Sequence, residues 1–274
     1  MRALTPIDDA GDPRLEVFRR NERGLANRVD RRADDGQGLF MAEGDLVVER
    51  ALDAGCRPHA VLVDAARPPA VTDRFDPDVP VYAGGDPVRA MVTGLGVPLA
   101  IVAVFHRPAR HTVDDLLTTS RRLVVVEAVD NPANIGSIVR NATGLGWDGL
   151  LVDGTSADPL ARRSLRVSMG TAVRMPWARA RDLAEPLARM RELGWTTVAL
   201  TPAADAPALD DVATAVGPAA GTVAILIGSE RAGLAETTLA AATVRARIPM
   251  APGVDSLNAA AASAIACYAL RPQG

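Results

Sequence analysis

The chain has 274 residues, of which 48% are apolar, and its net charge at pH 7 is −3. This length suffices for one large domain or two ordinary ones with hydrophobic cores. No run approaches the roughly 20 apolar residues that a membrane-spanning helix needs, and the first residues lack the apolar core of a secretion signal. We therefore expect a cytoplasmic protein without a membrane segment.

The basic residues are all arginine, and they are unevenly distributed. Seven arginines lie between residues 14 and 32, against three acids. A net negative charge argues against a protein that binds nucleic acid over its whole surface. One local basic patch is nevertheless enough to bind phosphates. A solvated, arginine-rich helix would explain the cluster equally well. The two cysteines and three histidines lack the spacing of metal ligands, so we expect buried thiols and no metal.

The first part of the chain predicts a small α/β domain over residues 1–108, followed by a linker at 109–120. The linker is expected because the surrounding residues are polar, contain a proline and show no sustained apolar period. The other expected elements are a polar helix or arm at 14–32, a short apolar segment at 39–44, helices at 45–55 and 86–94, strands at 60–64, 79–83 and 99–105, and an irregular connection at 65–80.

The second part, residues 121–274, alternates strands with helices. Strands are expected at 123–127, 149–153, 196–200 and 222–227, and helices at 136–145, 158–169, 181–193 and 255–270. Continuous apolar strands between helices indicate a parallel sheet that is covered on both faces. The predicted fold class is therefore α/β for both domains.

Three separated segments of the second part carry glycine or proline beside polar residues directly after apolar runs. They are residues 131–140, 227–234 and 248–258. An open α/β sheet places its ligand site beyond the carboxyl ends of its strands. Three such segments in one domain therefore predict an active site.

In the first segment, Asn134 is expected in the loop after a strand, with Gly136 opening the next helix and Arg140 about one turn further along. Free N–H groups at a helix start favour an anion, and the planar fork of an arginine suits phosphate. A helix cap with a surface arginine is the plain alternative. The segment alone does not decide between the two.

The second and third segments offer a pocket for a small ligand. Gly228 at a strand end gives a ligand close access to the main chain. Glu230 could pair with Arg140 or orient a substrate hydroxyl, or simply lie in the first turn of a helix. The proline-rich turn after residue 248 fixes a loop. Ser256 or Asp255 could simply cap the last helix, which is the plain alternative to a role in the site. No dinucleotide fingerprint or phosphate-loop lysine is present.

Together these motifs resemble the SpoU (TrmH-like) family of RNA ribose 2′-O-methyltransferases over about residues 121–270. The matching patterns are Asn134-x-Gly136-x-x-x-Arg140, Gly228-x-Glu230-x-x-Gly233, and Ile248-Pro249-Met250 with Ser256-Leu257-Asn258, and residues 164–170 resemble an intermediate segment. Residues 39–105 are similar, more loosely, to the RNA-binding domain that many members carry. Arg231 departs from the pattern, because a small residue tends to follow the motif glutamate.

The resemblance implies a C-terminal trefoil knot, which general rules of chain topology do not predict. It also implies S-adenosylmethionine as cofactor, held near Gly228, Ile248, Met250 and Leu257, and a homodimer whose site is completed across the interface. The implied catalytic set is Asn134, Arg140, Glu230, Ser256 and Asn258. The implied substrate is structured RNA, with ribosomal RNA favoured over transfer RNA because of the extra N-terminal domain.

Two other readings remain open at this point. The chain could be an RNA-binding or regulatory protein with an inactive cofactor pocket, and S-adenosylmethionine binding would discriminate against it. A nucleotide-cofactor oxidoreductase on a generic α/β sheet is disfavoured by the missing glycine fingerprint.

Overall fold

The computed structural model describes residues 4–26, 38–94, 96–217, 221–254 and 256–272. The chain divides into two compact units. Unit 1 comprises residues 1–110 and 160–174, and unit 2 comprises 111–159 and 175–274. Residues 160–174, which the sequence places inside the second domain, therefore pack with the first unit. Part of the N-terminal arginine cluster, from residue 27 onward, lies outside the described residues.

Unit 1 is built on a five-stranded mixed sheet with the order β1-β4-β3-β5-β2. The strands are β1 (Thr5–Ile7), β2 (Leu39–Glu43), β3 (Pro58–Asp64), β4 (Val81–Gly84) and β5 (Ile101–His106). Strands β1, β4 and β3 are parallel, whereas β5 runs antiparallel to both β3 and β2. The apolar segment at residues 39–44 is thus an edge strand.

The helices of unit 1 follow the expected stop signals. Helix α3 buries Val47, Val48 and Ala51, and the chain leaves it through Gly55 at a φ of +72°. Helix α4 ends at Gly94 in the left-handed conformation that glycine adopts without strain. The helices are α1 (Glu16–Arg19), α2 (Glu22–Leu25), α3 (Asp45–Asp53), α4 (Asp86–Thr93) and α7 (Arg162–Val167), with short 3-10 helices η1 (Pro13–Leu15), η3 (Ala70–Arg74) and η4 (Thr171–Val173).

The segment 160–174 is held to the rest of unit 1 by a buried ion pair. The Arg162 guanidinium bonds Glu43, whose side chain is only 1% exposed, and donates to the Thr93 carbonyl at 2.9 Å. Arg50 also donates to the Met169 carbonyl at 2.5 Å. These contacts explain why this stretch clusters with unit 1.

Unit 2 contains a six-stranded parallel sheet with the order β11-β9-β10-β6-β7-β8. Its strands are β6 (Arg122–Glu127), β7 (Gly149–Val152), β8 (Trp177–Arg179), β9 (Thr196–Leu200), β10 (Val223–Gly228) and β11 (Val244–Ala246). Strands β6, β7 and β10 are almost wholly buried. This burial confirms the parallel sheet that the continuous apolar runs predicted.

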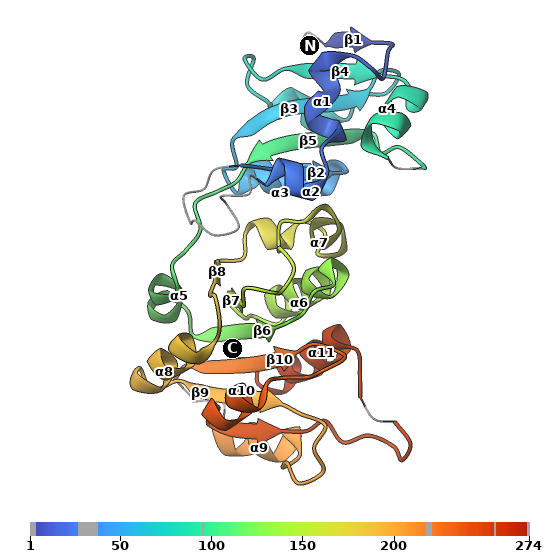
Figure 1. Ribbon diagram of the computed structural model, residues 1–274. Coiled ribbons are helices and arrows are strands. Elements are labelled where there is room, and N and C mark those ends of the chain that lie inside the picture. Colours follow the sequence, from blue (N-terminus) through green and yellow to red (C-terminus); the bar gives the residue numbers. More distant parts are fainter. Residues whose placement is uncertain (1–3, 27–37, 95, 218–220, 255, 273–274) are drawn as a thin grey trace. The chain divides into compact units, whose positions relative to one another are not determined.

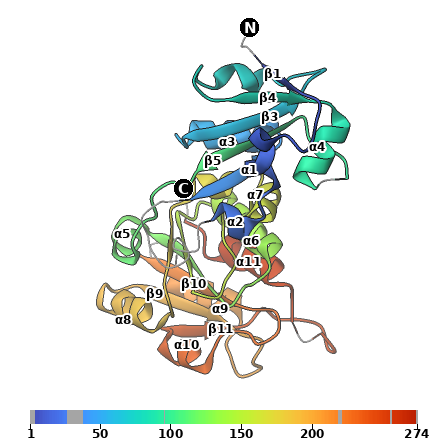
Figure 2. The same ribbon diagram turned by 45° about the horizontal axis from the view of Figure 1, so that its top comes forward.

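Helices cover the sheet of unit 2. The helices are α5 (Val113–Thr119), α6 (Pro132–Gly144), α8 (Ala184–Glu192), α9 (Leu209–Val216), α10 (Glu236–Ala241) and α11 (Ala259–Ala269). Helix α11 lies beside α6 and also contacts β10 and α9, while α10 packs against α8 (Figures 1 and 2). None of the helices in the described ranges is long and apolar enough to cross a membrane.

Two helix starts that bear on the predicted site differ from the sequence expectation. Helix α6 begins at Pro132, because the Asn131 side chain accepts from the Ala133 N–H and proline suits the first helical position. Asn134 therefore lies in the first helical turn rather than in the preceding loop, and Gly136 is inside the helix. Helix α11 begins after Asn258, which caps it in place of Ser256, while residue 255 lies outside the described residues.

The polar stretch expected as a linker contains a helix. Thr112 and Asp115 form a reciprocal capping box at the start of α5, and Leu116 and Leu117 join the apolar core of unit 2. Two apolar residues sufficed to anchor a helix too short to give a sustained periodic signal.

Candidate functional site

The predicted site lies where the order of strands in unit 2 reverses. From β6 the chain proceeds to β7 and β8 on one side, then returns through β9 and β10 on the other. Strands β6 and β10 are neighbours, with Glu127 opposite Gly228 at their carboxyl ends. Such a switch point opens a crevice between two diverging connections, which is where open α/β sheets bind ligands.

Three polar side chains of the predicted set meet at this point. The Asn134 amide donates to Glu230 Oε1 at 2.8 Å. Asn258 donates to the same carboxylate oxygen and also to Asn134 Oδ1 at 3.2 Å. The structure therefore joins one residue from each of the three motifs into a single hydrogen-bonded cluster, which we call the amide–carboxylate cluster.

Each member of this cluster has a defined place in the fold. Asn134 is 7% exposed and faces inward from the first turn of α6. Asn258 is the cap of α11, where its Oδ1 accepts from the Ala260 N–H at 2.9 Å. Glu230 follows β10 in a tight turn, closed by a hydrogen bond from the Gly233 N–H to the Ser229 carbonyl at 2.9 Å. The cluster thus links two helix starts to one strand end.

A pocket of about 410 Å³ adjoins the cluster. Glu230 and Ser256 line it together with the four residues expected to hold the cofactor, Gly228, Ile248, Met250 and Leu257. Leu200, Leu234 and Leu239 add apolar wall. A pocket of this size, with both apolar and polar side chains in its wall, suits a small organic ligand.

The wall of the pocket depends on the absence of a side chain at Gly228. A Cβ at this position would run into the main chain of Gly233 and Leu234. The motif glycines therefore let two stretches of backbone approach each other, and they leave main-chain groups open to a ligand. The same residues also hold the turn that carries Glu230.

Arg140 does not join the amide–carboxylate cluster. Its side chain is exposed on α6, and Glu230 is bonded to the two asparagines instead. Of the roles left open for Glu230, a pairing with Arg140 is not among its contacts in the structure, since the amides of Asn134 and Asn258 both bond its Oε1. Ser256 is exposed at the pocket edge, so both side chains remain accessible to a second molecule.

Arg231 gives the site a second connection between the first two motifs. Its guanidinium lies 3.1 Å from Asp130 Oδ2, and both side chains are largely exposed. Exposed ion pairs contribute little to stability. Arg231, the residue that departs from the family pattern, thus contacts the loop that precedes α6 through Asp130.

Two acidic residues that the sequence did not single out support the site. Glu127, at the end of β6, accepts from the Ala235 N–H at 2.9 Å and from the Thr238 hydroxyl at 2.8 Å, which fixes the start of α10. Asp153, at the end of β7, accepts from the Ala128 N–H at 3.0 Å. Both acids directly follow apolar strands in the sequence, and this position could have indicated a role at the site.

Asp153 also holds an unusual backbone conformation in place. Ala128 has a φ of +55°, which residues other than glycine rarely adopt. Burial alone raises the pKa of Asp153, but hydrogen bonds from Ser156, Thr155 and the Ala128 N–H together bring that pKa below its usual value. The ionised carboxylate therefore stabilises the loop that leads from β6 into α6.

No group of three or more potential metal-ligating side chains occurs among the residues that the structure describes. The site thus offers a pocket, an amide–carboxylate cluster beside it and an exposed arginine, Arg231, at its edge. This combination can hold and orient a polar organic ligand beside an anionic substrate.

Comparison with known proteins agrees with this geometry. The SpoU rRNA Methylase family matches residues 121–268. An uncharacterized tRNA/rRNA methyltransferase of Mycobacterium tuberculosis (strain ATCC 25618 / H37Rv) is 38% identical over 96% of this chain and 90% of its own length. The 23S rRNA (guanosine(2553)-2'-O)-methyltransferase RlmP of Bacillus subtilis (strain 168) is 27% identical over 85% of this chain and 88% of its own.

The fold is also that of a solved SpoU methyltransferase. AviRb from Streptomyces viridochromogenes, whose crystal structure is a complex with the cofactor AdoMet, superimposes with a TM-score of 0.76 at 26% identity, covering 94% of this chain and 97% of AviRb. The chain belongs to the SpoU rRNA methylase family. It is accordingly an RNA methyltransferase with an α/β fold.

Proposed function

We propose that this protein transfers a methyl group from S-adenosylmethionine to a ribose 2′-hydroxyl of structured RNA, with ribosomal RNA favoured over transfer RNA. The observation that supports this most directly is the amide–carboxylate cluster, because it unites all three family motifs beside one pocket. The named activity of RlmP on ribosomal RNA supports the choice of a 2′-hydroxyl and of the RNA class.

The pocket of unit 2 fits the cofactor. S-adenosylmethionine supplies an activated methyl group on a sulfonium centre. Main-chain groups near Gly228, Ile248 and Leu257 would hold its polar parts, and Met250 would cover its apolar side. The Glu230 and Glu236 carboxylates at the same pocket suit a cationic ligand.

The protein then has to align the ribose hydroxyl and stabilise its developing negative charge. Alignment of the reacting groups can lower the barrier by about 7–11 kcal/mol. We assign charge stabilisation to Arg140, whose guanidinium offers a fork of donors to an alkoxide or a phosphate. Ser256 orients the hydroxyl from the pocket edge. The bonds from Asn134 and Asn258 keep Glu230 in place.

The architecture suggests further parts of the proposal. After edge strand β11 the chain returns to pack α11 against α6 and β10 at the middle of the sheet, as a trefoil knot would require. We also propose a homodimer that completes the site from its partner, in the cytoplasm. Residues 1–108 would bind RNA, 109–120 would connect the domains, and 121–274 would carry the methyltransferase.

The proposal is tested by transfer of a radioactive methyl group from S-adenosylmethionine to total RNA, followed by mapping of ribose methylation. We expect one or a few RNase-resistant 2′-O-methyl positions that are missing in a deletion strain. Methyl groups found only on bases would contradict the assignment to ribose. Failure of the protein to bind S-adenosylmethionine in calorimetry would favour the alternative of an RNA-binding protein with an inactive pocket.

Arg140→Lys examines the role of the guanidinium separately from its charge. We expect kcat to fall by a factor of about 10²–10³, the range for loss of one preorganised donor at a developing oxyanion, with unchanged affinity for S-adenosylmethionine. Full activity of this variant would show that a fork of donors is not needed.

A further inference from the structure

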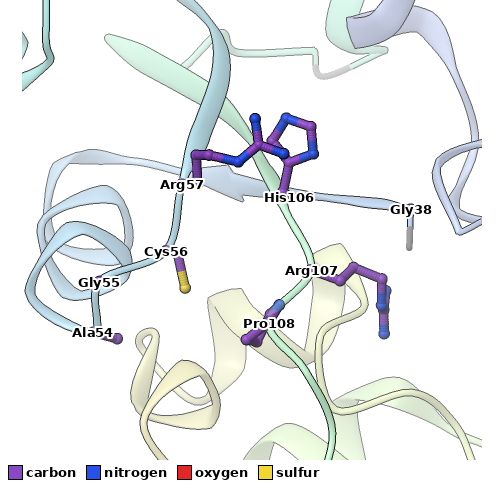
Figure 3. A pocket seen from close by; sticks show the side chains of 8 residues that line it. All are labelled: Gly38, Ala54, Gly55, Cys56, Arg57, His106, Arg107 and Pro108. Carbon is purple, nitrogen blue, oxygen red and sulfur yellow. The ribbon is translucent and has the colours of Figure 1, made fainter. Parts of the chain in front are cut away.

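A second pocket, of about 470 Å³, lies in unit 1 and plays no part in the proposed methyl transfer. Its lining comes from the end of α3, the start of β3 and the end of β5 (Figure 3). Arg57, His106 and Arg107 are its basic members, and its lining includes no Asp or Glu among the described residues. This volume lies in the range of pockets that hold small organic molecules.

One cation of this pocket, Arg57, is exposed. No ion pair with a described residue involves Arg57, and the nearby Asp53 is occupied by Arg74 at 2.7 Å. Figure 3 shows the side chains of Arg57 and His106 next to each other, with Arg107 leaving the same strand end in another direction. The pocket therefore has a positively charged rim.

A pair of histidines extends this rim. The rings of His59 and His106 meet edge to face, with centroids 5.2 Å apart. Burial lowers the pKa of both imidazoles, and the positive charges of Arg20 and Arg57 lower it further for His59, as Arg57 and His59 do for His106. An anion on this rim would oppose that lowering and draw protons onto the imidazoles.

The wall formed by the end of α3 has the reverse polarity. Ala54 and Gly55 stand at the carbonyl end of α3, where the helix favours hydrogen-bond donors. A ligand that fits both walls carries an anionic group on one side and N–H or O–H donors on the other. A nucleotide, with its phosphate and its ribose and base donors, has this character, whereas inorganic phosphate does not.

We propose that this pocket binds one unstacked nucleotide of a single-stranded RNA segment, with its phosphate on Arg57 and His106 and its sugar or base against the end of α3. The inference rests on the proposed function, since it takes RNA as the substrate and adds a contact remote in sequence from the methyltransferase motifs. Double-stranded RNA does not fit, because its paired bases cannot enter a concave pocket.

The test observes the histidines of the full-length protein by NMR while hexauridylate or inorganic phosphate is added. We expect hexauridylate to move the imidazole signals of His59 and His106 and to raise their pKa values. His111, which lies outside unit 1, serves as the internal reference and should not respond. Because binding takes up protons, affinity should increase from about pH 8 to about pH 6.

Two matched arginine variants make the assignment specific. Arg57→Gln should weaken hexauridylate binding roughly tenfold, as expected for loss of a hydrogen bond to a charged group, and reduce the salt dependence by about 0.7 in its log–log slope. Arg67→Gln removes another exposed charge, beyond the opposite end of β3, and this variant should bind like the unmodified protein.

Three results would overturn the inference: histidine signals that do not move at saturating hexauridylate, equal losses in both variants, or phosphate alone matching the effect of hexauridylate. The last result would mean a simple anion site. Unmoved histidines in a protein with normal methyl transfer would overturn only this inference. If the protein does not bind S-adenosylmethionine but its histidine signals still respond to hexauridylate, the proposed function is overturned instead.

Discussion

Glu230 is the residue on which the three motifs of unit 2 converge. A carboxylate that accepts from two amides is held in one orientation, because hydrogen bonds to charged groups are stronger than neutral ones. Two of its donors come from residues 134 and 258, which are far apart in sequence. The site therefore depends on long-range packing, and its geometry should be sensitive to a change in any one of the three side chains.

Two variants that each remove a helix cap distinguish the effect of the amide–carboxylate cluster on activity from its effect on helix stability. Asn258→Ala removes the cap of α11 and a donor to Glu230, while Asn131→Ala removes only the cap of α6. Each should lower the free energy of unfolding by about 1 kcal/mol. We expect methyl transfer to fall at least tenfold in Asn258→Ala and to stay within twofold in Asn131→Ala, measured at saturating RNA. Equal activity in both would mean that the cluster is only structural.

Gly228→Ala addresses the close approach of backbone in the pocket wall. The added methyl group meets main-chain atoms of Gly233 and Leu234, which cannot rotate away as a side chain would. We expect the free energy of unfolding to fall by about 1–3 kcal/mol and S-adenosylmethionine binding to be lost in calorimetry. Gly144→Ala is the control, since a Cβ there meets nothing within 4 Å. A Gly228→Ala protein with normal binding would contradict the proposed pocket.

At the scale of elements, the long apolar strands and well-capped helices could be predicted from the sequence. Strands such as β6 and β10 are buried on both faces, so every residue contributes to the signal. The three-residue strands β8 and β11 were not predicted, because pairing with a longer neighbour, rather than their own composition, makes them strands. The short helix α5 in the expected linker was missed for another reason, because its two buried leucines are too few to give a periodic signal.

The site was predicted as a set of residues but not as a geometry. Motif spacing indicated Asn134, Glu230 and Asn258. It could not indicate that the two asparagines rather than Arg140 contact Glu230, because that depends on where α6 begins. The helix starts four residues earlier than Gly136 suggested, since Asn131 caps it.

The loop between β6 and α6 offers a test of how an element is held in place. Replacement of Asp153 by asparagine puts an amide among the donors of Ser156, Thr155 and the Ala128 N–H. We expect a loss of about 1–3 kcal/mol in the free energy of unfolding at neutral pH, measured by denaturant titration.

The pH dependence of that loss has a definite sign. The pKa of Asp153 is lowered in the folded protein, so its stabilisation is present above the unfolded value of about 3.9 and disappears as the pH falls through the folded value. The difference in the free energy of unfolding between the unmodified protein and Asp153→Asn should therefore become smaller below about pH 4. A constant difference across this range would show that the charge of Asp153 does not contribute.

At the scale of the whole molecule, each unit contains one buried cysteine. Cys56 lies in unit 1 and Cys267 in unit 2. Burial raises the pKa of Cys56 to about 11 and that of Cys267 to about 12. Because the thiolate is the reactive form, neither should be alkylated rapidly in the folded protein. The two thiols can therefore report separately on the opening of each unit.

Breaking the ion pair between Arg162 and Glu43 tests whether the two units open independently. Arg162→Met leaves the Glu43 carboxylate buried with its strongest partner removed, which typically costs about 3–5 kcal/mol. Since both residues belong to unit 1, iodoacetamide should label Cys56 much faster in this variant while Cys267 keeps its original rate. Arg74→Met, which breaks an exposed pair with Asp53, should change neither rate by more than a few-fold.

The comparison of the two labelling rates decides how residues 160–174 function in the chain. This segment lies between β7 and β8 in sequence but packs with unit 1. Parallel acceleration of both thiols in Arg162→Met would mean that unit 2 cannot remain folded when the segment is released. Acceleration of Cys56 alone would mean that residues near 159 and 175 act as joints between separately stable units, as the division of contacts leads us to expect.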